Sequence, residues 1–193
     1  MMSALFAACP DDNPTHAAMF CLPLASIAEQ AGVEVLALPE QQRQQEAPAR
    51  IFELTPAEQF CAATLNDLDP VLNGWGLDKA KVDQCFDAAL AQRPGTLRQC
   101  VLELQYWNQL YWLRDAAGGT AAGDYSAAAS ARQNYVFRCL SRIRPRDIEE
   151  AAVVLRYLVN DNGLDRPQSG AILLNLIGAP EPYRPHEVGG GHA

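Results

Sequence analysis

The sequence predicts an all-α protein: an irregular bundle of about six to seven helices around a central apolar helix at about residues 97–116. Three observations favour this class. The composition, with 49% hydrophobic and 20% charged residues, is that of a globular chain rather than a disordered one. Apolar residues recur at helical spacing through most of the chain after residue 55. Capping residues, proline and glycine separate these periodic stretches.

Breaks in the periodicity divide the chain into parts. We expect an N-terminal helical segment at residues 1–32, a linker with short extended runs at 33–54, a helical domain at 55–178 and a flexible tail at 179–193. The linker contains two brief apolar runs, 33–38 and 51–54, which are candidates for a short extended pair. A stretch rich in Gln and Glu separates them. The tail is rich in proline and glycine and lacks an apolar period.

The helical domain opens with two helices whose starts are marked by caps. Thr55-Pro56-Ala57-Glu58 is a capping box with proline at the first helical position, which predicts a helix from residue 56. Asp78 caps the next helix. The buried stripe of this second helix is expected at Val82, Cys85, Phe86, Ala89 and Leu90.

The central helix begins after Thr96, which again stands in capping-box form, and ends at Gly118-Gly119. Its apolar side chains cover two faces: Leu97, Val101, Leu104, Trp107 and Tyr111 on one, and Leu102, Tyr106, Leu110 and Leu113 on the other. A helix that is apolar nearly all round must be covered on several sides. We therefore expect the other helices to pack around it.

Three further helices are predicted between residue 119 and Gly178. The first ends at Arg144-Pro145. The second begins at Asp147, and its buried stripe is expected at Ile148, Ala151, Ala152, Leu155, Leu158 and Val159. The third begins after Asp165 and ends at Gly178.

An arginine cluster is the strongest local signal for a binding site. Six of the thirteen arginines lie within 25 positions, namely Arg132, Arg138, Arg142, Arg144, Arg146 and Arg156. Arg138 and Arg142 are one helical turn apart and opposite an apolar face, so we expect both to project to solvent beside the corner formed by Arg144 and Arg146. The arginine fork matches phosphate oxygens, so a nucleic acid or a phosphate ligand at residues 138–146 is one hypothesis.

The charge of the whole chain argues against that hypothesis. The net charge is −8, and residues 1–96 carry all of it. Nucleic-acid-binding domains usually present a basic surface. A partner other than nucleic acid is therefore the better expectation.

Aromatic residues from Tyr106 to Trp112 allow two interpretations. Trp and Tyr at helical spacing are typical of a core, and this is the interpretation we prefer. A small-molecule binder or enzyme with a pocket beside Trp107 is the alternative. Trp112 lies off both apolar faces, so we expect it to be an exposed contact residue.

No residue pattern for catalysis, metal binding or cofactor binding is recognisable. Two of the three histidines lie in the tail, and His16 is expected at the surface of a first helical turn. The six cysteines are far apart without a CxxC pair, which indicates reduced core thiols rather than a zinc site. Neither GxGxxG nor GxxxxGK[ST] occurs. We therefore expect no catalytic residue, no metal and no cofactor.

These observations lead to one preferred function. We expect a non-enzymatic helical interaction or adaptor protein with a protein partner, either of phage origin or a component of a larger assembly. An Arg-rich, Lys-poor composition favours a bacterial source, and the lack of an export signal favours the cytoplasm. No apolar run reaches the length of a membrane span, so no membrane contact is expected.

Overall fold

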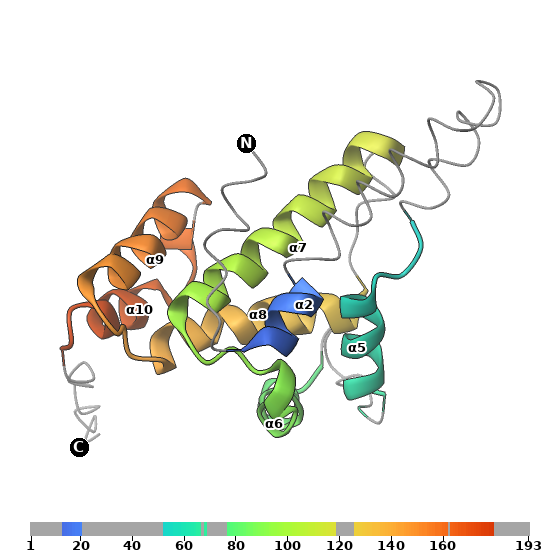
Figure 1. Ribbon diagram of the computed structural model, residues 1–193, viewed down its shortest axis with the longest axis horizontal. Helices are drawn as coiled ribbons and strands as arrows, with labels where there is room; N and C mark the ends of the chain where they lie inside the picture. Colours follow the sequence, from blue (N-terminus) through green and yellow to red (C-terminus); the bar gives the residue numbers. More distant parts are fainter. Residues whose placement is uncertain are drawn as a thin grey trace, which may run out of the picture.

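The computed structural model describes residues 13–20, 52–66, 68, 77–118, 126–161 and 163–179. These residues form helices and contain no strand, which confirms the all-α class (Figure 1). In chain order the elements are α2 (Pro14–Phe20), α5 (Pro56–Thr64), α6 (Lys79–Ala88), the 3-10 helix η1 (Leu90–Gln92), α7 (Leu97–Gly118), α8 (Ala127–Arg142), α9 (Ile148–Asn160), the 3-10 helix η2 (Gly163–Asp165) and α10 (Ser169–Leu176). Within this part of the chain, no helix has the length and apolar character of a membrane span.

Helices α7 and α8 together form the centre of the bundle. Figure 1 shows α7 running diagonally above α8, with α9 and α10 at one end and α5 at the other. α7 packs against α2, α8 and α9, whereas α8 also contacts α5, α6 and α10. Their buried apolar side chains are Leu97, Cys100, Val101, Leu104, Tyr106, Trp107, Leu110, Ala129, Tyr135, Val136, Phe137, Cys139 and Leu140. The predicted central helix is therefore central, but it shares this position with α8.

Local capping explains where several helices begin. The Thr55 hydroxyl accepts a hydrogen bond from the Glu58 amide at 3.2 Å, and the Glu58 carboxylate accepts one from the Thr55 amide at 2.9 Å. Asp78 caps α6 and Asp147 caps α9 in the same manner, by accepting bonds from amides of the first turn. Each such cap contributes about 1 kcal/mol. These three helix starts agree with the prediction.

The capping residue Glu58 also ties α5 to α7. Arg114 of α7 donates to both oxygens of the Glu58 carboxylate, at 2.6 and 2.9 Å, and to the carbonyl of Glu53 at 2.9 Å. Residues 52–54, which were candidates for an extended run, form a turn at this point. The other candidate run, 33–38, lies outside the described residues.

The N-terminal helix α2 is part of the same core. It packs against α5, α7 and η1, and Phe20 is fully buried. The expectation that His16 lies at the surface is wrong, because α2 presents this side chain to α7, where it is 1% exposed. The predicted boundaries at 32–33 and 178–179 fall at or beside residues outside the described stretches, and the division into domains stays a prediction.

Helix α9 is rotated about its axis relative to the prediction. Glu150, Val154 and Tyr157 point inward with Ala151 and Leu158, whereas Ile148, Leu155 and Val159 are exposed. The difference amounts to about a quarter turn at 3.6 residues per turn. α9 carries more apolar side chains than its neighbours cover. The hydrogen bonds of the Glu150 carboxylate to the backbone amides of Arg98 and Arg146 fix which side of the helix is buried.

Candidate functional site

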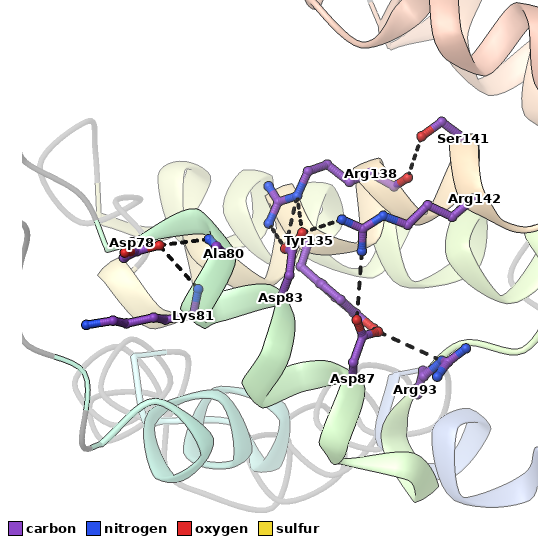
Figure 2. A network of polar contacts seen from close by, with 10 residues as sticks. All are labelled: Asp78, Ala80, Lys81, Asp83, Asp87, Arg93, Tyr135, Arg138, Ser141 and Arg142. Atoms are coloured by element: carbon purple, nitrogen blue, oxygen red, sulfur yellow. Dashed lines mark hydrogen bonds and ion pairs between the residues drawn. The ribbon is translucent and has the colours of Figure 1, made fainter. Parts of the chain in front are cut away.

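Two arginines of the cluster, Arg138 and Arg142, are paired with aspartates of α6 (Figure 2). Arg138 Nε lies 3.0 Å from Asp83 Oδ1 and 3.2 Å from Oδ2, and Arg138 Nη2 also donates to this carboxylate. Arg142 donates to Asp83 and lies 3.9 Å from Asp87 Oδ2. Asp87 in turn accepts a hydrogen bond of 2.7 Å from the Tyr135 hydroxyl.

The expectation that Arg138 projects to solvent is wrong. It is 9% exposed, because α6 packs on the face of α8 that carries it. The Arg142 side chain is 45% exposed. Burial alone would raise the pKa of Asp83, but the hydrogen bonds from Arg138 and Arg142 hold it below the ordinary value. An anionic ligand would therefore have to compete with Asp83 for both arginines.

The other two predicted arginines, Arg144 and Arg146, are exposed at the corner between α8 and α9. Glu150 holds this corner in place. Its Oε2 accepts a hydrogen bond from the Arg146 amide at 2.8 Å, and its Oε1 accepts one from the Arg98 amide of α7 at 3.1 Å. The arginines are thus carried on an ordered turn, and their role in binding stays a prediction.

A buried polar cluster, which the sequence analysis missed, joins α2, α7 and α8. The Glu103 carboxylate accepts hydrogen bonds from Arg132 Nε at 2.7 Å and from Arg132 Nη2 at 2.9 Å. His16 Nε2 lies 2.7 Å from Glu103 Oε2, and Trp107 Nε1 donates to Oε1 at 3.3 Å. Both Glu103 and Arg132 are 0% exposed. Burial alone would raise the pKa of Glu103, but Arg132 and His16 bring it below the ordinary value.

Aromatic rings complete the surroundings of Arg132. Its guanidinium carbon lies 4.8 to 5.6 Å from the ring centres of four residues on α2, α5, α6 and α8, namely Phe20, Phe60, Phe86 and Tyr135. Such cation–π contacts stabilise a desolvated guanidinium. Arg132 Nη2 also donates to the carbonyl of Gln92 at 2.7 Å. The charged atoms are enclosed, and the cluster joins α2, α7 and α8.

Trp107 and Trp112 have opposite environments. Trp107 is fully buried, with its ring 5.0 Å from Tyr106 and 6.0 Å from Phe20, which supports the interpretation as core packing. Trp112 is 65% exposed, as its position off the apolar faces predicted. No group of three or more potential metal ligands occurs among the residues that the structure describes.

The outer face of α9, which we define as Ile148, Leu155 and Val159, carries three exposed aliphatic side chains. These side chains are 75%, 45% and 58% exposed. The sequence predicts all three in a buried stripe. Their apolar period was therefore recognised, but the side of the helix that faces solvent was not.

Comparisons with known proteins found no matching protein family, no similar curated protein and no similar solved structure.

Proposed function

We propose that this protein is a non-enzymatic helical interaction protein and that the outer face of α9 is its contact surface. The observation that carries the proposal is the exposure of three large aliphatic side chains on one side of one helix. Complete burial of an exposed aliphatic side chain contributes at most about 1.5–3 kcal/mol, and these three side chains are 45–75% exposed before binding. Neighbouring exposed aliphatic residues of this kind are a common mark of a protein-binding surface.

The helix that carries this face is held firmly. Asp147 caps its first turn through a hydrogen bond of 2.7 Å from the Glu150 amide. The Glu150 side chain anchors the same turn to α7, as described above. A partner would therefore meet a helix that is already ordered, which reduces the entropy lost on binding.

Trp112 offers a second contact near the same helix. One turn earlier on α7, the Asn108 side chain donates a hydrogen bond of 3.0 Å to Asp161, the residue that follows α9. Trp112 therefore lies just beyond the C-terminal end of α9. Tryptophan is enriched among the residues that contribute most to binding energy at interfaces.

The cellular setting is a further part of the proposal. We propose a bacterial cytoplasmic adaptor, of phage origin or belonging to a larger assembly. The support for this setting is compositional, since arginine outnumbers lysine 13 to 2.

A pull-down with the full chain as bait tests the contact surface. The wild-type chain should recover a partner in stoichiometric amount, and Leu155→Lys combined with Val159→Lys should abolish the capture. Leu90→Lys is the matched control, because Leu90 is an aliphatic residue that is 73% exposed on η1, which packs against α2 and α6. Circular dichroism verifies that all variants remain helical. Equal capture by the double variant and the control would contradict the proposal.

A further inference from the structure

The spacing of the outer face of α9 fits a second helix. Together with the half-buried Ala152, the exposed residues Ile148, Leu155 and Val159 follow spacings of four, three and four. Such a heptad pattern forms the seam of paired helices, and here it spans about 60° of the helix circumference. The small Ala152 side chain near the middle of the seam permits close approach of two backbones. A single helix covers a seam this narrow.

Charged residues along one edge of this seam indicate which helix binds there. Glu149 and Arg156 are exposed and lie seven residues apart, so they occupy the same edge. No ion pair between either residue and another described residue occurs in the structure. The opposite edge, with Ala151 and Leu158, is buried against the rest of the molecule. Only the charged edge is available to a partner.

We propose that the outer face of α9 binds the same face of a second copy of this chain, with the two helices antiparallel. In an antiparallel pair related by a twofold axis, like edges of the two helices meet. Glu149 then faces Arg156 of the partner subunit, and the symmetry forms this ion pair twice. In a parallel pair the charged edge would face the buried edge of the other helix, and no charges would match.

This inference rests on the proposed function, because it names the partner for the same surface. One further aliphatic residue, Leu164, is 45% exposed on η2, which packs against α9. α9 is about 20 Å long, from 13 residues at 1.5 Å each. A seam of this length predicts a reversible dimer rather than a permanent one.

Sedimentation equilibrium of the full chain over a range of concentrations tests the dimer. We expect the mass to rise from 21.0 kDa towards twice that value. Leu155→Lys should raise the dissociation constant at least about tenfold, which corresponds to 1.4 kcal/mol. Leu90→Lys should leave it unchanged.

Charge exchange tests the antiparallel arrangement. Glu149→Arg alone and Arg156→Glu alone should each weaken the dimer, because like charges then meet twice. The chain with both substitutions should dimerise like the wild type. An equimolar mixture of the two single variants should also dimerise, because both contacts then join opposite charges.

The outcomes separate this inference from the proposed function. A wild-type chain that stays at 21.0 kDa overturns the dimer. If such a monomer still captures a different protein through Leu155, the proposed function stands. If it captures none, both fail. A dimer that Leu155→Lys leaves intact, or a mixture of charge variants that stays monomeric, overturns the antiparallel α9 contact.

Discussion

Replacing Arg132 by methionine should lower the free energy of unfolding by about 3–5 kcal/mol. Methionine fills much of the space of the arginine stem but leaves the Glu103 carboxylate buried without the two hydrogen bonds from Arg132, at 2.7 and 2.9 Å. The carbonyl of Gln92 also loses its donor. Removing one member of a buried ion pair is costly mainly because the remaining charge stays desolvated.

The size of this effect is large for a single domain. Typical domains are stable by about 5–15 kcal/mol, so the variant should remain folded with a clearly smaller margin. For a chain of this length, 1 kcal/mol corresponds to about 2–4 °C in melting temperature. We therefore expect a decrease of about 6–20 °C.

Urea unfolding monitored by circular dichroism measures the change. Arg142→Met is the control, because Arg142 is paired but its side chain is 45% exposed, and the loss of such a pair costs about 1 kcal/mol or less. In a double-mutant cycle with Glu103→Gln, the two substitutions should be coupled by about 1–3 kcal/mol. An effect of Arg132→Met no larger than that of the control, or additive effects in the cycle, would refute the reasoning.

Three further predictions follow from the buried groups. The pKa values of Glu103 and Asp83 lie below their ordinary values. The stability that both ionised carboxylates contribute is therefore present at neutral pH and should be lost as pH falls below about 4.5. Acid titration followed by circular dichroism measures this loss. Burial raises the pKa of Cys100, so site-resolved mass spectrometry after alkylation of the native protein should find Cys85 labelled before Cys100. Glu150→Gln weakens two hydrogen bonds to backbone amides and should lower stability by about 1–3 kcal/mol in thermal unfolding.

Sequence reasoning succeeded where the determining interaction is local. The caps at Thr55, Asp78 and Asp147 bond amides no more than three residues away, so the sequence around each helix start contains all the necessary information. The exposure of Trp112 followed from its angle on the helix, which lies off both apolar faces. The helical class follows from many such signals together.

Sequence reasoning failed where a residue far away in the sequence determines whether a side chain is buried. His16 is buried because Glu103, 87 positions later, lies opposite it. Arg138 is covered because Asp83, 55 positions earlier, lies on a helix whose packing partner no local pattern identifies. The rotation of α9 depends on Glu150 and the Arg98 amide, 52 positions apart. The available signal for this buried pair was a charged residue among the apolar residues of its own helix, as Glu103 is on α7 and Arg132 is on α8.

The buried position of Glu103 also affects when the core can close while the chain is being synthesised. His16 precedes this residue during synthesis, whereas Arg132 follows it. A ribosome that has released only α2 to α7 has produced a carboxylate whose strongest counterion is still missing. The desolvation cost therefore opposes closure of the core until α8 emerges, and products that terminate before Arg132 should remain open to chaperones and proteases.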